Sequence, residues 1–377
     1  MSQGQNSSIQ REQNERLILL LMREHRQLSK TDIALLTGLT YPAVARIVDT
    51  LATKCLVRKK GTEKKQMGKP TALYEIEANG RLALGIEILS DTLAIAVINF
   101  HGNILMIQKH PLKQQTTAAV AEQIYLRVIE LVTSMPLEQQ RALDGIGIVG
   151  SSRDNICLAE ITSQLTNQLK SQHHQSLHQL TAGIATQGIA AAAAELITNP
   201  ARANKQLLYI YIGNDIDGCF IFANKINHHR PSEKPFLASM PVGLPSQTSG
   251  RNTGSDSLNT QASLNSLHRQ LDLTCASSGN HLDWQQLNPI THKVVADWFQ
   301  NAARALAFSI EASASLHQLD EIIISSPISP DWLHTLINQI KDNTSLPLQK
   351  KIRSGVAGEN KLIIGAAALM LIDTPKG

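Results

Sequence analysis

Apolar residues in the first fifty positions recur at helical spacing in three separate stretches, residues 14–25, 33–36 and 44–51. Residues three or four positions apart lie on one face of a helix, so each stretch predicts a helix with one buried side. In the third stretch this side is a continuous stripe of Val44, Ile47, Val48 and Leu51. The sequence therefore opens with three short predicted helices.

The polar residues between these stretches indicate where the helices begin and end. Ser29 and Asp32 have the spacing of a capping box, and Gly38 predicts a tight turn after the second helix. Thr40 is a good N-cap for the third helix, and Pro42 falls in its first turn, where a missing N–H costs little. A short helix, a glycine turn and another helix form the helix-turn-helix pattern, which places its second helix in the major groove of DNA.

Side chains off the apolar stripe of the third helix are the candidate contacts with duplex DNA. Tyr41 and Arg46 are predicted to reach bases or phosphates, and Thr31, Thr40 and Pro42 lie at the adjoining helix ends. A plain helical hairpin in a bundle is the alternative interpretation of this pattern. The segment that follows argues against the alternative.

Two predicted strands follow the third helix and enclose a strongly basic hairpin. One strand begins at Cys55 and the other spans Thr71–Ile76. Between Arg58 and Lys69 the chain has six basic residues and one acidic residue. Such a hairpin can neutralise phosphates, and its predicted contacts are Arg58, Lys59, Lys60, Lys64, Lys65 and Lys69. Residues 1–80 are therefore predicted to form a winged helix-turn-helix DNA-binding domain.

The charge distribution favours a polyanionic partner for this domain alone. Of the 377 residues, the first 80 hold 13 Lys and Arg and 8 Asp and Glu, a net charge of +5, whereas residues 81–377 have a net charge of −1. The N-terminus lacks an apolar signal segment, and no apolar run approaches the ~20 residues that span a bilayer. Four scattered cysteines fit free thiols in a reducing compartment. We expect a cytoplasmic, nucleoid-associated protein with no membrane partner.

Residues 81–377 alternate short apolar runs with helical patterns, which predicts an α/β fold. The predicted strands are 84–89, 93–98, 104–107, 145–149, 207–212, 219–223 and 321–325. The predicted helices are 117–133, 183–198, 293–317, 330–341 and 356–372. The repeated order of strands and helices predicts two related lobes with a cleft between them. Residues 243–283 are dense in Ser, Asn, Gln, Thr and Gly and predict a low-complexity loop.

Taken together, these segments resemble the ROK family (repressors, open reading frames, kinases), in its repressor branch. The segment from Ser29 to Thr40 is similar to the helix-turn-helix of these repressors, and Gly68-Lys69-Pro70 is similar to the Gly-Arg-Pro that closes their wing. Further resemblances lie at 84–88, 209–218, 240–242, 319–324 and 365–367. The resemblance implies a winged helix-turn-helix followed by a two-lobed, actin-like (ribonuclease H-like) body, as in the N-acetylglucosamine and xylose repressors.

Departures from the family's kinases predict a body without catalysis. Glu87 stands where the kinases have Asp, and Asp215 and Asp217 stand in the turn that is glycine-rich in the kinases. Carboxylates there would repel phosphates, which need bare amides. Gln187 falls near the catalytic Asn-Asp, and an amide cannot act as a general base near neutral pH. The positions equivalent to the family's ligand contacts are Ser151, Ser152, Gln187, Phe236 and Ser239.

The family's structural zinc is not expected in this chain. A structural zinc needs about four nitrogen or sulfur ligands. Residues 243–283, where the cluster should fall, contain only Cys275 with His268 and His281. We expect no metal and no cofactor.

The favoured hypothesis is a DNA-binding regulator, in particular a repressor, of carbohydrate-related genes. It would bind a double-stranded operator as a homo-oligomer, either a dimer or a tetramer, because paired recognition helices read two-fold sites. The body would sense a sugar or sugar phosphate, or would instead dock a protein partner. An active sugar kinase is the alternative, which the altered positions argue against.

Overall fold

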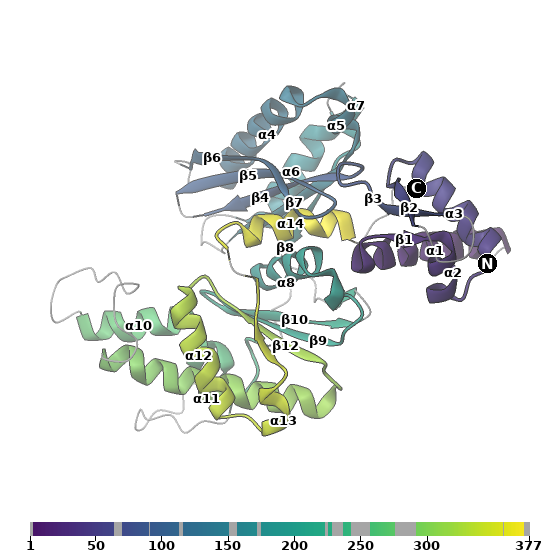
Figure 1. Ribbon diagram of the computed structural model, residues 1–377. Coiled ribbons are helices and arrows are strands. Elements are labelled where there is room, and N and C mark those ends of the chain that lie inside the picture. The colour runs from purple at the N-terminus through teal and green to yellow at the C-terminus, as the bar shows by residue number, and fades with distance from the viewer. Residues whose placement is uncertain are drawn as a thin grey trace. The chain divides into compact units, whose positions relative to one another are not determined.

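The computed structural model describes residues 3–63, 70–89, 91–112, 116–150, 157–171, 175–222, 225–227, 237–242, 257–275, 292–356 and 358–372 (Figure 1). The chain divides into two compact units. The first consists of Met1–Ile184, Leu196–Ala203 and Ile363–Gly377. The second consists of Ala185–Glu195 and Asn204–Leu362.

The first unit begins with the predicted helices and basic hairpin. The helices are α1 (Gln3–His25), α2 (Lys30–Thr37) and α3 (Tyr41–Thr53). Strands β1 (Leu28–Ser29), β2 (Val57–Glu63) and β3 (Thr71–Ile76) form a three-stranded sheet in the order β1-β3-β2. Helix α1 begins well before the predicted 14–25, because its first part has no apolar stripe to reveal it.

The predicted boundaries of α2 and the predicted start of α3 are confirmed, whereas the predicted start of the hairpin is not. The Ser29 hydroxyl accepts from the Asp32 amide, the Asp32 carboxylate accepts from the Ser29 amide, and Gly38 ends α2 in the left-handed region with φ 71°. The strand predicted from Cys55 is wrong at its first residues. Cys55 has a φ of 56°, which takes it out of an extended conformation, and the strand begins at Val57.

The remainder of the first unit is built on a five-stranded sheet in the order β6-β5-β4-β7-β8. Its strands are β4 (Leu82–Ile88), β5 (Thr92–Asn99), β6 (Ile104–Pro111), β7 (Leu143–Gly150) and β8 (Thr181–Ala185). Strands β4, β5 and β6 are antiparallel, and β7 pairs with β4 in parallel. The helices of this part are α4 (Thr117–Ser134), α5 (Leu137–Arg141), α6 (Leu158–Lys170) and α7 (Gln175–His178).

The two faces of this sheet are covered in different ways. Helices α4 and α6 bury their apolar stripes against one face, and α14 (Lys361–Ile372) lies on the other (Figure 1). Glycines permit the close approach of α14. A Cβ at Gly85 would stand 2.1 Å from the Ile363 carbonyl oxygen, and one at Gly147 would stand 1.8 Å from that of Ala366.

The second unit has a five-stranded sheet in the order β11-β10-β9-β12-β13. Its strands are β9 (Leu207–Ile212), β10 (Ile216–Phe222), β11 (Lys225–Asn227), β12 (Glu321–Ser325) and β13 (Ile352–Ser354). Its helices include α9 (Leu258–Ala262), α10 (Leu264–Cys275), α11 (Lys293–Leu316), α12 (Pro330–Asp342) and α13 (Leu346–Gln349). Helix α8 (Gln187–Thr198) begins in this unit, and a short 3-10 helix (Pro200–Arg202) follows it in the chain.

The core of the second unit centres on aromatic side chains. Phe299 makes edge-on contacts with Trp298 and with Trp332, each at a centroid distance of 5.3 Å. Trp298 is fully buried, as expected for a core anchor, and its indole N–H donates to the Ser266 hydroxyl at 2.8 Å. This hydrogen bond joins α10 to α11.

Part of the predicted low-complexity loop is helical. Helices α9 and α10 fall within residues 243–283, and their side chains Leu258, Ala262, Leu264, Leu267 and Leu271 are buried in the core. The loop prediction is therefore wrong for 258–275. The apolar residues have helical spacing, but the dense polar residues between them hid it.

Two predicted helices of the body begin too early. Residues 183–185 belong to strand β8, so the helix predicted from 183 begins at Gln187. The helix predicted over 356–372 begins at Lys361. Among the described residues, no helix has both the length and the apolar character that crossing a membrane requires.

Candidate nucleic-acid interface

Helix α3 separates its buried stripe from an exposed polar face, as the sequence predicts. Val44, Ile47, Val48 and Leu51 are buried. The predicted contact residues at the helix ends are all exposed, namely Thr31, Thr40, Tyr41, Pro42 and Arg46. More than half of the Tyr41 surface (54%) is open to solvent. The Thr40 hydroxyl makes no capping hydrogen bond, although Thr40 occupies the N-cap position, so the hydroxyl is available to a ligand.

An ion pair holds α2 against α3. The Lys30 ammonium lies 2.6 Å from the Asp49 carboxylate and 5.3 Å from the centre of the Tyr74 ring on β3. Partial burial acts to lower the Lys30 pKa, but the hydrogen bond and charge of Asp49 outweigh it and raise the pKa overall. These contacts of Lys30 connect α2 to both α3 and strand β3 of the hairpin.

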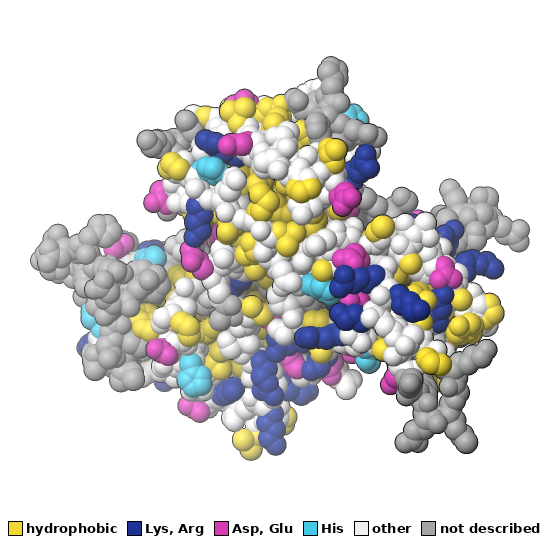
Figure 2. Space-filling model, turned by 45° about the horizontal axis from the view of Figure 1, so that its top comes forward, with side chains coloured by type: hydrophobic (Ala, Val, Ile, Leu, Met, Phe, Trp, Pro, Cys, Tyr) yellow, Lys and Arg dark blue, Asp and Glu magenta, His cyan; other side chains and the backbone are white. Residues whose placement is uncertain are grey.

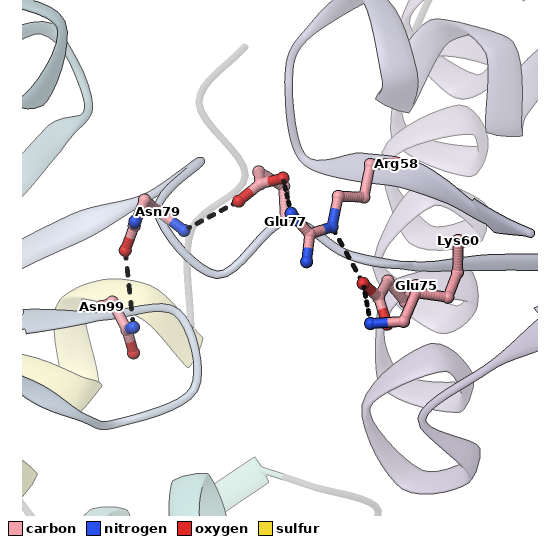
Figure 3. A network of polar contacts seen from close by, with 6 residues as sticks. All are labelled: Arg58, Lys60, Glu75, Glu77, Asn79 and Asn99. Atoms are coloured by element: carbon pink, nitrogen blue, oxygen red, sulfur yellow. Dashed lines mark hydrogen bonds and ion pairs between the residues drawn. The ribbon is translucent and has the colours of Figure 1, made fainter.

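The basic hairpin is partly neutralised by acidic residues of its own sheet (Figure 3). Glu75 on β3 accepts from Arg58 at 2.8 Å and from Lys60 at 3.1 Å, both on β2. Arg58 also lies 3.3 Å from the Glu77 carboxylate. Burial acts to raise the Glu75 pKa, and the two cations outweigh it and lower the pKa. Two of the predicted phosphate contacts therefore already have carboxylate partners.

The same network reaches the body of the first unit. The Asn79 amide donates to the Glu77 carboxylate at 3.4 Å, and the Asn99 side chain at the end of β5 donates to that of Asn79 at 3.5 Å (Figure 3). The hairpin is thus tied to the adjoining sheet by polar contacts.

The other predicted basic contacts divide into two groups. Lys59 and Arg46 are exposed, and the described part of the chain places no ion-pair partner on either. Lys64, Lys65 and Lys69 lie outside the described residues. Figure 2 shows Lys and Arg side chains in several groups on the surface, with Asp and Glu and apolar side chains among them.

In the second unit, Asp215 lies in the turn that joins β9 to β10, as predicted, but Asp217 is not in the turn, because it already belongs to strand β10 and pairs there with Tyr211. Asp217 is buried, and its carboxylate accepts from the amide of Gly188 at 2.7 Å and from that of Gly218 at 2.8 Å. Gly188 lies in the first turn of α8, where unpaired amides attract an anion. The protein's own carboxylate therefore occupies this helix N-terminus.

Other amides of this turn are also engaged. The Ile216 amide donates to the Asn259 side chain at 2.7 Å, and Asn259 donates in turn to the Asp215 carboxylate at 2.9 Å. The Gly213 amide donates to the Asp215 carbonyl at 3.3 Å. A phosphate would find these amides already used.

The predicted ligand positions of the body are only partly described. Gln187 is half-buried beside the same turn, where its side-chain oxygen would stand 2.9 Å from a Cβ at Gly213. Ser239 is exposed in a turn. Ser151, Ser152 and Phe236 lie outside the described residues. Within the described ranges there is no cluster of three His, Cys, Asp or Glu side chains that could hold a metal ion.

Sequence reasoning missed a group of arginines where α1 meets the part of the first unit that is built on the five-stranded sheet. Arg23 of α1 and Arg81 both lie against the Phe100 ring, at 4.7 and 5.1 Å from its centre. Arg81 forms a buried ion pair with Asp144. No motif links these residues, because their hydrogen bonds join positions that are 63 to 290 residues apart in the chain.

Comparisons with known proteins give relatives of two kinds. No family model matches the chain. The sequence is 26% identical over 152 residues to the "Putative xylose repressor" of Caldicellulosiruptor sp. (strain Rt8B.4), a match that covers 40% of this chain and 38% of that protein. The chain thus spans less than half the length of this curated relative.

Solved structures match over more of the chain. A ROK family transcriptional regulator, a homologue of the E. coli MLC protein, superposes with a TM-score of 0.69 at 14% identity and covers 97% of both chains. The ROK hexokinase of Thermus thermophilus superposes with a TM-score of 0.57 at 15% identity and covers 76% of this chain. At these identities the likeness establishes the fold alone, and the predicted α/β fold class is confirmed.

Proposed function

We propose that this chain, which has the fold of the ROK family transcriptional regulators, is itself a regulator that binds duplex DNA through residues 1–80. The observation that carries the proposal is the exposed face of α3, where Tyr41 and Arg46 stand opposite the buried stripe. A recognition helix needs such a face, because its side chains must reach base edges in the major groove.

The extent of the structural matches supports this assignment. The regulator matches 97% of the chain and the hexokinase 76%, a difference of 21% (97 − 76). Residues 1–80 make up 21% of 377 residues (80/377). We infer that the additional matched part is the DNA-binding domain, and that residues 81–377 form the ROK-like body.

A binding assay with genomic DNA tests the proposal. Fluorescence anisotropy would compare the affinity for genomic fragments that the protein binds with the affinity for random DNA, at about 50 and 200 mM salt. The wild type should bind its site at least ~10³-fold more tightly than random DNA. Arg46→Ala should weaken binding to the site ~10- to 100-fold, as loss of a base or phosphate contact does.

Two further variants separate phosphate contacts from general effects. Lys59→Gln should weaken binding to all DNA sequences equally and reduce the salt dependence of the affinity by a slope of about 1. Lys170→Gln, an exposed cation on α6 outside the DNA-binding domain, should change neither quantity. If the full-length protein prefers no genomic fragment to random DNA at low salt, the proposal fails.

We propose further that the body does not transfer phosphate. Its support is the β9–β10 turn together with the start of β10. There the Asp217 carboxylate caps α8, and the amides of Gly213, Ile216 and Gly218 already donate within the chain. An incubation with ATP and a panel of hexoses should yield no sugar phosphate. Product formation that disappears in an Asp217→Ala variant would contradict this inference.

The body is proposed to sense an effector and to form the homo-oligomer, acting on carbohydrate-related genes as a cytoplasmic repressor. A thermal-shift screen with sugars and sugar phosphates tests the small-molecule form of this proposal. A rise of several degrees with one compound supports it. No response to any compound would favour control by a protein partner instead.

A further inference from the structure

Arg23 on α1 is a buried cation at the junction between the proposed DNA-binding domain and the part of the first unit that is built on the five-stranded sheet. It retains 8% of its surface exposure. Its Nη2 donates to the Phe100 carbonyl at 3.2 Å, and its guanidinium carbon lies 4.7 Å from the centre of the Phe100 ring. These contacts use one of the five N–H donors that a guanidinium carries.

No carboxylate of the described residues lies within ion-pair distance of Arg23. Arg81, which faces the same ring, is different, because Asp144 pairs with it and the carbonyls of Leu371 and Met370 accept from it at 2.9 and 3.3 Å. The ring therefore contacts two guanidinium groups, and of these only Arg81 has a counter-charge among the described residues. A buried charge without a partner is costly, so a compensating anion would be favoured here.

A pocket opens beside these two arginines. It has a volume of about 30 Å³, and its lining includes Arg16, Arg23 and Arg81 together with Leu20, Phe100 and Ile372. Burial and the neighbouring Arg81 lower the pKa of Arg23 to about 10, so its guanidinium stays charged at neutral pH. The volume suits a group of a few atoms.

We propose that this pocket binds the oxyanion group of a small ligand, a phosphate or a carboxylate, with Arg23 as its main donor. A guanidinium offers paired N–H groups that match both kinds of oxyanion. Binding would pin α1 to the Phe100 turn and to the end of α14. A regulatory effect on DNA rests on the proposed function, whereas the anion site itself does not.

Anion titration of the full-length protein without DNA tests the site. Thermal unfolding is followed with sodium phosphate in one series and sodium acetate in another, each balanced with sodium chloride to constant ionic strength. The wild type should show a saturable rise in Tm of roughly 2–4 °C in at least one series. The series that responds identifies the preferred oxyanion.

Arg23→Gln should abolish the rise, and without added anion it should unfold at the wild-type temperature or above, because it removes an uncompensated buried charge. A purely structural role would instead lower its Tm. Arg127→Gln, an exposed cation of α4 paired with Glu130, is the matched control and should keep the full response. Arg23→Lys keeps the charge without the fork and should weaken the anion affinity ~10-fold.

Two results would overturn the proposal. One is no saturable response to either anion up to about 100 mM, a range that covers weak sites with Kd near 1 mM. The other is an equal response in Arg23→Gln, or in Arg23→Lys if the glutamine variant does not fold, which would mean that the anion binds elsewhere. A separate DNA titration of wild type and Arg23→Gln with and without the anion then measures coupling, so failure to bind DNA leaves the site itself decided.

Discussion

Arg81 is the side chain on which the packing of the first unit depends most directly. It pairs with Asp144, and the two side chains are 6% and 4% exposed. It also donates to carbonyls in the last turn of α14. One guanidinium therefore joins β7 and α14.

Arg81→Met should lower the free energy of unfolding by about 3–5 kcal/mol, because it removes the cation that pairs with the buried Asp144 carboxylate. Urea denaturation measures this value. Arg127→Met breaks the exposed pair with Glu130 and should cost at most about 1 kcal/mol. Equal losses in the two variants would contradict the role given to burial.

Lys361 presents the opposite case, a buried amine with neutral partners. Its ammonium donates to the Ser325 hydroxyl at 3.0 Å and to the Ser326 carbonyl at 2.5 Å, and it lies 5.4 Å from the centre of the Tyr211 ring. Burial lowers its pKa from 10.5 to about 8, although Glu195 acts in the opposite direction. Between these values the unfolded chain binds more protons than the folded protein.

Stability should therefore rise with pH through this window. Relative to Lys361→Met, the wild type should gain up to about 3 kcal/mol of unfolding free energy between pH 8 and 10.5, as a shift of this size implies. Urea unfolding at a series of pH values measures the difference. Lys350→Met, at an exposed lysine, is the control and should show no such trend. A flat difference for Lys361→Met would contradict the prediction.

At this scale, sequence reasoning succeeded where local structure follows from neighbours in the chain. The capping box of Ser29 and Asp32 is local, and so is the apolar stripe that turns Tyr41 and Arg46 outward. Arg23 and Arg81 gave no such indication. Their partners are brought to them by tertiary folding, which spacing does not encode.

Among the elements, the packing of α14 on the five-stranded sheet of the first unit depends on two glycines, Gly85 and Gly147. Gly147→Ala should displace the helix, because the new Cβ would stand 1.8 Å from a backbone carbonyl oxygen. We expect a loss of several kcal/mol, at or above the ~1–3 kcal/mol typical of overpacking. Thermal and urea unfolding check this prediction.

Gly61→Ala is the matched control for that substitution. Gly61 lies on β2, and a Cβ there meets nothing within 4 Å. Its unfolding free energy should change by at most about 1 kcal/mol. If both alanine variants keep wild-type stability, α14 does not need the close approach that the structure gives it.

Elements with a strong period were predicted well, and those with a weak period were not. Strands β9 and β12 have the predicted boundaries, since continuous apolar runs mark buried strands. Helices α9 and α10 were missed, because dense polar residues separate their buried leucines. Strand β8 contains no long apolar run, and its pairing at the sheet edge is not visible in its sequence.

At the scale of the whole molecule, the acidic partners of the hairpin should limit its grip on DNA. Glu75 holds both Arg58 and Lys60, so Glu75→Gln should free Lys60 for phosphates, whereas Arg58 keeps its ion pair with Glu77. Affinity for random DNA should rise several-fold, and the salt slope should steepen by about 1 per freed cation. Anisotropy titrations at several salt concentrations measure both quantities.

Glu63→Gln provides the matched control for the loss of charge. Glu63 is exposed on the same hairpin, and no described side chain pairs with it. It removes one negative charge without releasing a cation, so its effect should be smaller than that of Glu75→Gln. Equal effects would show that net charge, and not the ion pairs, sets the affinity.

The division of the first unit between distant parts of the chain has a consequence for biosynthesis. Strands β4 to β7 are complete at Gly150, but the α14 residues that cover their second face begin at Ile363, 213 positions later (363 − 150). At roughly 5–20 residues per second, a ribosome needs about 10–40 s to supply them. Throughout that interval one apolar face of the nascent sheet is not covered by its helix. We therefore expect the need for a chaperone to be greatest during this stage of synthesis.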